Sequence, residues 1–307
     1  MAESITEFAA FPVVRKLMAQ CTFPSDGQSL DCAVSGGADS SALLILAAAS
    51  GCIVTAHHVD HGLRQGSADE ANVVADLAIR LGASFCSHTA TIEPGANLEA
   101  RARSARYALL PNPVATGHTL DDRAETILIN LMRGAARTGQ SPLTDPTRHP
   151  IVNLRRADTE AVCRALGVTP VADPSNNDPN FVRNRVRHEL VPLLDDISNR
   201  DVALLLDRQA DILGDEDRFL DGLAEHIDAT DAKAVAAAPT VLARRALRRF
   251  IMDNWSLGHP PSVESIGRVL SVAQGVATAC EIEGGHRVHR TNQKLRLECA
   301  VVSVTPE

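Results

Sequence analysis

The segment from Leu30 to Ala49 most constrains the fold, because it has the pattern of a strand, a glycine loop and a helix in direct succession. An apolar run ends at Val34, the string Ser-Gly-Gly-Ala-Asp-Ser fills residues 35–40, and an alanine- and leucine-rich run follows. Two adjacent glycines allow a sharp turn that brings successive N–H groups together, and the helix start adds about half a positive charge. The segment therefore predicts a site for an oxyanion such as a phosphate.

The loop differs from the two commonest nucleotide-binding loops, because it lacks both Gly-x-x-x-x-Gly-Lys-[Ser/Thr] and the spacing Gly-x-Gly-x-x-Gly. Ser35, Ser40 and Ser41 offer hydroxyl donors, and Asp39 can hold a cation or position a reacting group. These groups suit a pyrophosphate that is bound and then released. The alternative is a tight strand-to-helix turn in which Ser40 caps the helix.

Apolar runs and helical patterns alternate through the first half of the chain. The expected strands are 30–34, 52–59, 83–88 and 113–117, and the expected helices are 38–50, 67–81, 97–110 and 120–133. Strands separated by helices of this length predict an α/β fold with a parallel, doubly wound sheet.

Ligands of such sheets bind beyond the carboxyl ends of the strands, so chemical groups should gather there. At or just after its end, the second strand delivers His57, His58, Asp60, His61 and Arg64, and the fourth delivers Gly117, His118, Asp121 and Asp122. His118 and Asp122 are four residues apart across a helix start, so one turn of helix can direct both to the same place. Alternatively, Asp121 and Asp122 only offset the helix dipole, and His61 is a buried structural histidine.

A domain boundary is expected near residue 197, which gives a catalytic domain over 1–197 and a smaller, mainly helical domain over 198–307. Residues 139–156 are rich in proline and arginine and are expected to form a long surface loop. In the second domain, helices are expected at 203–227, 240–252 and 261–274, and short strands at 278–283, 286–290 and 295–302.

Composition narrows the class of protein. A net charge of −8 over 307 residues argues against indiscriminate nucleic-acid binding, although arginine supplies nearly all of the 30 basic residues and clusters near 155, 185 and 245. The seven cysteines never form Cys-x-x-Cys and are expected to be small buried hydrophobes. No apolar run is long enough to span a bilayer and the start is acidic, so a cytoplasmic location without membrane contact is expected.

Several strings, in this order, resemble the tRNA(Ile)-lysidine synthases, a branch of the N-type ATP pyrophosphatases with a PP-loop. The similar strings are Ser35–Ser40, Val59–Arg64, Asn97–Arg103 with Arg106 and Tyr107, Gly117–Thr126, and Asp173–Asn176 followed by Arg183–Arg187. The resemblance covers about residues 30–195 and implies the compact form of the family, without an extra C-terminal domain. Where the family usually has Arg-Pro-Leu-Leu, this chain has His149-Pro150-Ile151-Val152, so no role is transferred from that arginine.

The resemblance implies that ATP adenylates the wobble cytidine of tRNA(Ile) with a CAU anticodon, and that L-lysine then displaces AMP to give lysidine. The ATP-binding residues that it implies are Ser35, Gly36, Gly37, Ala38, Asp39, Ser40, His61 and Gly117. The catalytic residues that it implies are Asp39, His118, Asp122 and Arg103, with Asp39 also the candidate Mg²⁺ ligand. Asp122 is assigned to the cytidine base or the lysine ammonium, and His118 to the phosphates. For Arg103 the alternative is an ion pair with Glu99 on one helical face.

The tRNA-binding residues expected from the arginine clusters and the motifs are Arg183, Asn184, Arg187, Arg244 and Arg248. The alternative is that each cluster is a solvated helix face. Two other functions also remain open: a PP-loop enzyme that thiolates tRNA, and an ATP-binding protein without catalysis. Thiolation usually needs paired cysteines or an iron–sulfur cluster. The sequence allows a homodimer without indicating one.

Overall fold

The computed structural model describes residues 5–60, 67–90, 98–135, 137–171, 178–254 and 259–299. The chain divides into two compact units, Met1–Leu213 and Gly214–Glu307, and helix α10 (Val202–Glu225) runs across the division. The boundary expected near residue 197 lies just before α10 begins. As a boundary between a catalytic part and a tRNA-binding part, it stays a prediction.

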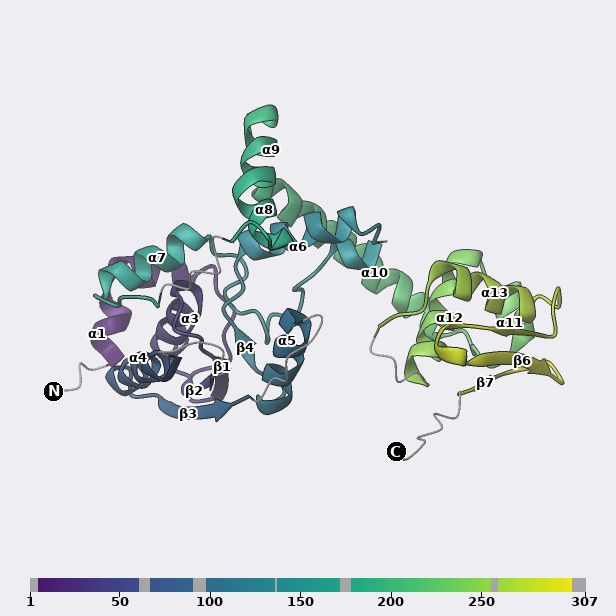
Figure 1. Cartoon of the computed structure of the whole chain (residues 1–307), viewed down its shortest axis with the longest axis horizontal. Coiled ribbons are helices and arrows are strands. Elements are labelled where there is room, and N and C mark those ends of the chain that lie inside the picture. The colour runs from purple at the N-terminus through teal and green to yellow at the C-terminus, as the bar shows by residue number, and fades with distance from the viewer. Residues whose placement is uncertain are drawn as a thin grey trace. The chain divides into compact units, whose positions relative to one another are not determined.

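A parallel four-stranded sheet with the order β3-β2-β1-β4 forms the centre of the first unit (Figure 1). The strands are β1 (Ser29–Ala33), β2 (Ile53–Asp60), β3 (Ser84–Thr89) and β4 (Ala115–Thr116). Each begins and ends within two residues of its predicted range, and every pairing is parallel. The predicted fold class is therefore confirmed, and the carboxyl ends of the strands lie at the same edge of the sheet.

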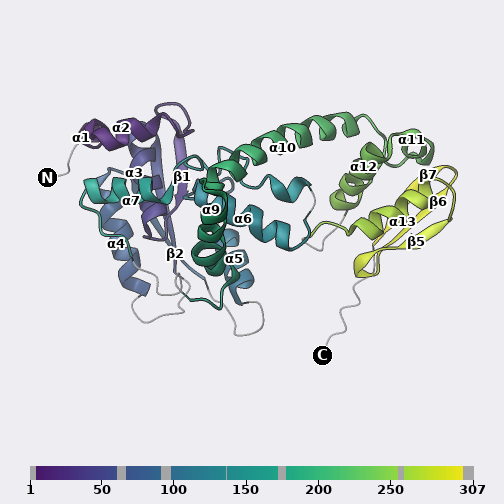
Figure 2. The ribbon, with the colours of Figure 1, turned by 90° about the horizontal axis from the view of Figure 1, so that it is seen from above.

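Helices cover both faces of this sheet, as Figures 1 and 2 show, with α3 and α4 on one side and α5 on the other. These helices are α3 (Ala38–Ala49), α4 (Ser67–Arg80) and α5 (Leu98–Leu109). Helix α6 (Leu120–Met132) follows β4. Helix α3 is apolar all round, and its residues from Ser41 to Ala48 are buried. A helix of that kind must be covered on every side.

Three helices that the sequence did not predict provide this cover. They are α1 (Ile5–Ala10), α2 (Pro12–Met18) and α7 (Arg156–Ala165), and all three contact α3. The expected surface loop over 139–156 leads into α7 and contains one short 3₁₀ turn before it, Arg137–Gln140. Helix α7 was missed because half of its residues are polar and only three, Thr159, Val162 and Cys163, are buried.

Side chains of β2 alternate between the two faces of the sheet. Val54 and Ala56 are buried in the core that includes α3 and α4, whereas Ile53 is 62% exposed. Because successive residues of a strand point to opposite faces, the odd-numbered residues of β2 lie on the face away from α3 and α4.

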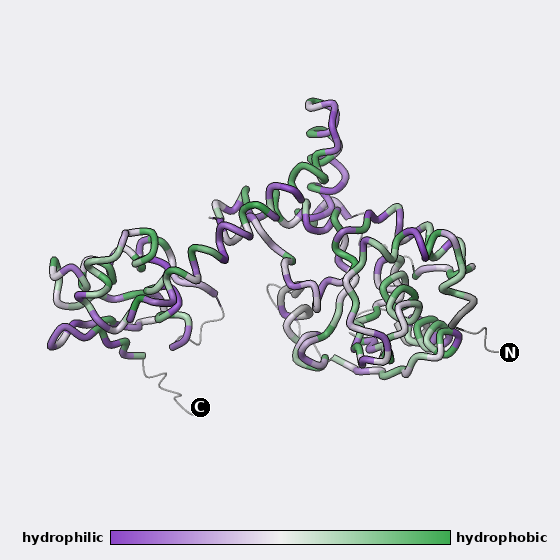
Figure 3. The backbone as a smooth tube through the Cα atoms, turned by 180° about the vertical axis from the view of Figure 1, so that it is seen from behind, coloured by the Kyte–Doolittle hydropathy of each residue, from purple (hydrophilic) through white to green (hydrophobic). Residues whose placement is uncertain are grey.

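The first unit ends in a run of short helical segments before α10. They are α8 (Val182–Arg185), a π-helical turn (Val186–Leu190) and α9 (Val191–Ser198). Figure 3 shows hydrophilic and hydrophobic residues alternating along α10, whose large hydrophobic side chains Ile212 and Phe219 are more than 60% exposed. The buried side chain of Arg123 on α6 holds the start of α10 through Asp207 at 2.6 Å and Asp211 at 2.7 Å.

The second unit packs three helices on an antiparallel sheet with the order β5-β6-β7. Its elements are α11 (Ala232–Ala237), α12 (Thr240–Asp253), α13 (Val263–Ala273), β5 (Ala279–Glu281), a 3₁₀ turn (Glu283–Gly285), β6 (Arg287–Thr291) and β7 (Lys294–Glu298). The predicted helices and strands are present, although β7 ends four residues before its predicted end at 302.

Two expectations from composition can be compared with the described residues. None of their helices has the length and apolar character to cross a membrane. Cys32, Cys52 and Cys163 are buried as expected, but Cys21, Cys86 and Cys280 are only partly buried and Cys299 is exposed. The expectation that all cysteines are inert core residues is therefore wrong.

Candidate active site

The loop after β1 has a backbone that closes on itself. Gly36 has φ +89°, a conformation that favours glycine, and Gly37 is the N-cap residue of α3. The Ser40 hydroxyl donates to the Gly37 carbonyl at 3.1 Å and accepts from the Ser35 amide at 3.2 Å. The Gly36 carbonyl is already used by the Val171 amide at 2.9 Å. The loop is thus held from both sides at the N-terminus of α3, where the helix dipole favours an anion.

Gly117 brings the end of β4 against this loop. A Cβ atom at Gly117 would lie 2.8 Å from the backbone carbon and oxygen of Asp39, closer than real side chains approach. Only glycine therefore allows the loop between β4 and α6 to pack on the first turn of α3. This contact joins the two strand ends that the sequence singled out.

His118 follows Gly117 and contacts Thr116 at the end of β4. The Thr116 hydroxyl donates to the Arg148 carbonyl at 3.1 Å, and it lies 2.6 Å from His118 Nδ1 and 2.9 Å from His149 Nδ1. Because its one proton goes to the carbonyl, the two imidazoles must donate to it from Nδ1. In its neutral form His118 then carries its proton on Nδ1, and its Nε2 can accept a proton or a hydrogen bond.

Asp122 lies at the start of α6 within a capping box. Its Oδ2 accepts from the Thr119 amide at 2.9 Å and from the Thr119 hydroxyl at 3.0 Å. Its Oδ1 lies 3.2 Å from Arg156 Nη2 and 3.5 Å from Arg187 Nη2. Burial would raise the pKa of Asp122, but Arg156, Arg183, the Thr119 amide and His118 hold that pKa below its usual value. Asp122 is therefore an anion at neutral pH.

Glu125, one turn further along α6, collects the same three arginines. Its side chain is 2% exposed, and it accepts from Arg187 Nε at 2.7 Å, Arg183 Nε at 2.9 Å and Arg156 Nη2 at 3.3 Å. The three arginines come from α7, α8 and the π-helical turn. Two buried carboxylates of α6 thus gather side chains from three later segments of the chain.

Asp39 faces this cluster from the first turn of α3. Its Oδ1 accepts from the Thr159 hydroxyl, and its Oδ2 lies 3.7 Å from Arg156 Nε. The pKa of Asp39 is raised to about 6, mainly by burial and also by Asp122, against the Thr159 hydrogen bond and the nearby charges of Arg156 and Arg187. Arg156 therefore links the glycine loop to Asp122 and Glu125.

A cavity of about 1030 Å³ opens in front of these groups, at the carboxyl ends of the strands. Its lining includes Ser35, Gly37, Ala38, Asp39, Ser40, Gly117, His118, Arg156 and Arg187. The cavity is large enough for a nucleotide and has both an anion-binding loop and cationic side chains in its wall.

Comparisons with known proteins agree with this arrangement. The family model of the PP-loop domain matches residues 12–194. A tRNA(Ile)-lysidine synthase of Rhodococcus erythropolis is 41% identical over 237 residues, which are 72% of this chain and 73% of the relative. One of Nocardia farcinica is 37% identical over 294 residues, 90% of each chain. This chain belongs to the tRNA(Ile)-lysidine synthase family.

A solved structure supports the fold at greater distance. The U34-tRNA thiolase NcsA of Methanococcus maripaludis, described with its [4Fe-4S] cluster, superimposes with a TM-score of 0.51. It is 17% identical and covers 68% of this chain and 79% of that chain. At this identity the likeness shows a shared PP-loop fold and nothing about chemistry.

Most of the predicted catalytic and ATP-binding residues lie around the cavity described above. Five of the six loop residues (all except Gly36), Gly117 and His118 line it, and Asp122 lies behind Arg156. The predicted ATP-binding residue His61, the side chain of the predicted catalytic residue Arg103 and the string Asp173–Asn176 lie outside the described residues. Asp121 instead anchors α7, since its carboxylate accepts from the Arg155 side chain at 2.8 Å and from the Arg156 amide at 2.7 Å.

The predicted tRNA-binding residues fall into two groups. Arg183 and Arg187 pair with Glu125, and the buried Asn184 side chain donates to the Asp178 carbonyl at 2.9 Å. In the second unit, Arg244 is exposed on α12 and Arg248 lies one turn further on. The neighbouring Arg245 instead pairs with Asp217 and Asp221 of α10.

Four residues near the cavity were not predicted: Glu125, His149, Arg156 and Thr159. Glu125 lay in a quoted motif, and Arg156 in an arginine cluster. What the sequence did not contain was their pairing, because Arg156 is 31 residues from Glu125 and Thr159 is 120 residues from Asp39.

Proposed function

We propose that this protein is an ATP-dependent ligase that joins L-lysine to C2 of the wobble cytidine of tRNA(Ile) with a CAU anticodon. An adenylated cytidine would be the intermediate, and AMP and diphosphate the other products. The resulting lysidine would switch decoding from AUG to AUA. The observation that carries the proposal is the packing of Gly117 on Asp39, which gives one cavity both the PP-loop and His118 in a chain of this family.

The phosphate loop and the two arginines of the wall would bind the triphosphate. The loop supplies amides and serine hydroxyls at the N-terminus of α3, and Arg156 and Arg187 supply charge. Their contacts with the buried carboxylates hold both guanidinium groups in place before substrate arrives. Such preorganisation favours charge that develops on a leaving pyrophosphate.

Asp39 is the residue that would hold Mg²⁺. Its carboxylate borders the cavity with a side chain 27% exposed, and Mg²⁺ commonly binds through one or two carboxylates together with substrate phosphates. The residues fit such an ion, because Oδ2 has only the 3.7 Å contact with Arg156, beyond normal hydrogen-bond distance. When bound, the ion would neutralise phosphate charge.

His118 and Asp122 would act on the reacting groups. The Nε2 of neutral His118 would take a proton released during transfer, and once protonated it would donate to a phosphate oxygen. Asp122 Oδ2 is committed to Thr119, so the exocyclic amine of cytosine or the ammonium of lysine would share Oδ1 with Arg156. Arg103, from its motif, would contact phosphate or the base.

The tRNA would approach along basic side chains near the cavity and in the second unit. Arg183 and Arg187 keep 35% and 21% of their side-chain surface exposed while paired with Glu125, so both can add a phosphate contact. Asn184 would support their helix, and Arg244 and Arg248 would add a second contact region. We expect the protein in the cytoplasm with its tRNA, and light scattering would reveal a homodimer by a doubled mass.

A direct assay tests the proposal. The purified protein is incubated with ATP, Mg²⁺, labelled L-lysine and tRNA(Ile) bearing a CAU anticodon, with methionine tRNA as the control. AMP should form only with tRNA(Ile), and label should enter that RNA. Formation of AMP without tRNA, or RNA that never acquires label, would show that the assignment is wrong. The thiolation alternative is disfavoured because no Cys-x-x-Cys occurs in the sequence.

A further inference from the structure

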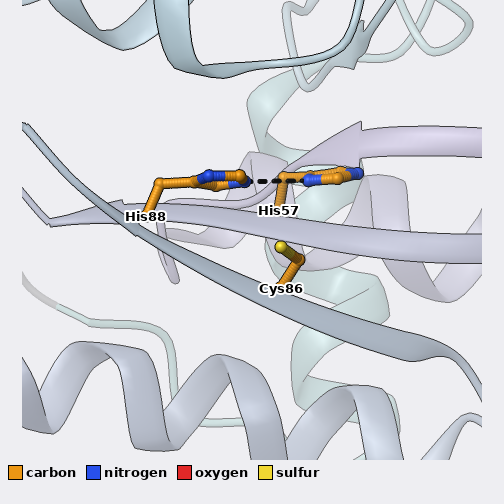
Figure 4. Close-up of side chains that lie close together, drawn as sticks. All are labelled: His57, Cys86 and His88. Carbon is orange, nitrogen blue, oxygen red and sulfur yellow. Dashed lines mark hydrogen bonds between the residues drawn. The ribbon is translucent and has the colours of Figure 1, made fainter.

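Three side chains that commonly bind metal ions meet on one face of the sheet. His57 comes from β2, and Cys86 and His88 come from the adjacent strand β3 (Figure 4). The strand register places His57 opposite Cys86 and Val59 opposite His88. Because residues two apart on a strand share a face, all three side chains lie on the face away from α3 and α4.

Their ligand atoms are close enough to share one ion. His57 Nδ1 lies 3.1 Å from His88 Nε2, and these nitrogens and Cys86 Sγ all lie within 4.8 Å of one another. In a tetrahedral zinc site, metal–ligand distances of about 2.0–2.3 Å place ligand atoms roughly 3.3–3.8 Å apart. The two nitrogens already approach that spacing, and a shift of about 1 Å at most brings the thiol into place.

A fourth residue orients His57 as metal-binding histidines are usually oriented. Asp31, on the neighbouring strand β1, lies 2.8 Å from His57 Nε2. The carboxylate accepts a hydrogen bond from the Nε2–H of His57, which leaves the Nδ1 lone pair of His57 directed toward His88. A carboxylate bonded to the distal nitrogen of a histidine ligand is the usual outer contact in zinc sites.

The chemistry of the group selects the ion. Two imidazoles and one thiol suit Zn²⁺, whereas Mg²⁺ prefers oxygen ligands and an iron–sulfur cluster needs several thiolates. Metal binding would release the thiol proton of Cys86.

We propose that His57, Cys86 and His88 bind one Zn²⁺ ion, with Asp31 orienting His57 and the fourth position open to water. His57 also lines the cavity described above, so the ion would lie beside the nucleotide site and be separate from Asp39. The proposal does not depend on the lysine ligation reaction.

Metal binding can be measured without any enzyme assay. The reduced, chelator-stripped protein is titrated with Zn²⁺ against a chromophoric chelator, and with Co²⁺ while its absorption spectrum is recorded. One equivalent of Zn²⁺ should bind, and Co²⁺ should give a thiolate-to-metal charge-transfer band with the intense visible bands of tetrahedral geometry. Absence of saturable binding or of the charge-transfer band would overturn the proposal.

Variants locate the site. Cys86→Ser and His88→Gln should each lose the charge-transfer band or weaken Zn²⁺ binding by at least about 100-fold, while Asp31→Asn should weaken it by about 10- to 100-fold. Cys299→Ser and His226→Gln remove an exposed thiol and an exposed imidazole, and should change nothing. Far-UV circular dichroism of the metal-free variants verifies their folding. Retained affinity in folded Cys86→Ser, or lost affinity in Cys299→Ser, would place the ion elsewhere and refute the assignment.

Discussion

Replacing Glu125 by glutamine tests whether α6 gathers the arginines of the cavity wall. The glutamine keeps the volume of the side chain, but it removes the charge and turns an amide N–H₂ toward guanidinium groups. Glu125 is 2% exposed and accepts four hydrogen bonds, one from Arg156, one from Arg183 and two from Arg187. The substitution therefore perturbs three cationic side chains at once.

The expected loss of stability follows from this geometry. Removing one partner of a buried ion pair usually costs about 3–5 kcal/mol. The arginine side chains of this cluster are 21–35% exposed, so they can recover part of that loss from water. We expect a decrease of about 3 kcal/mol in the free energy of unfolding. For a unit the size of Met1–Leu213, this corresponds to a fall in Tm of roughly 6–12 °C.

Thermal and urea unfolding followed by circular dichroism measure this change, and Glu189→Gln is the matched control. Glu189 forms an exposed i,i+4 pair with Arg185, so its loss should leave the free energy of unfolding nearly unchanged. ATP affinity, measured by calorimetry at a temperature where the variant is folded, should also fall for Glu125→Gln alone. A stability change no larger than that of the control would refute the view that Glu125 holds the cluster.

Other outcomes follow from the same site. Asp39→Asn should abolish tRNA-dependent AMP formation while tRNA affinity in a filter-binding assay stays within about twofold; a matching loss of affinity would contradict its place beside the phosphates. Because burial raises the folded pKa of Asp39 to about 6 from 3.8, its ionisation opposes folding as pH rises through that range. The Asn variant should therefore be more stable than the parent by roughly 1–2 kcal/mol at pH 8, and its advantage should be much smaller at pH 4. Equal gains in stability at both pH values would argue against this. Gly117→Ala should cost about 1–3 kcal/mol and lower kcat, because its Cβ meets the Asp39 backbone at 2.8 Å; unchanged unfolding would disprove that contact. Arg187→Ala should reduce the dependence of the tRNA binding constant on salt concentration by about one counterion, and Arg185→Ala, which removes a side chain 63% exposed, is the control. The same salt dependence for the parent and Arg187→Ala would show that the RNA binds elsewhere.

The parts of the site that sequence could predict are local. The loop over 35–40 was recognisable because two glycines, an apolar run and a helix start are contiguous, and Gly117 because it ends the fourth strand. The parallel sheet then brings both strand ends to the same edge, as expected for this architecture. Local signals and topology together predicted that His118 would reach the loop.

The parts that sequence missed depend on pairing between distant segments. Arg187 was expected to contact RNA, yet its nearest partner is Glu125, 62 residues earlier. The helical pattern of α6 gave no sign that Glu125 points inward, because glutamate is common on exposed helix faces. The sequence contains no Cys-x-x-Cys, and Cys86-x-His88 gave no signal of a metal site because the third residue of the cluster, His57, is on a different strand.

The charges of the site explain why a cation should accompany the nucleotide. Three arginines, at positions 156, 183 and 187, face three carboxylates, Asp39, Asp122 and Glu125, so the cluster itself carries little net charge. A bound triphosphate adds several negative charges. The arginines cannot neutralise them all, because they already neutralise the three carboxylates. The N-terminus of α3 offers only about half a positive charge. The proposed Mg²⁺ would supply the remainder, with Asp39, which lines the cavity, as the carboxylate that would receive it.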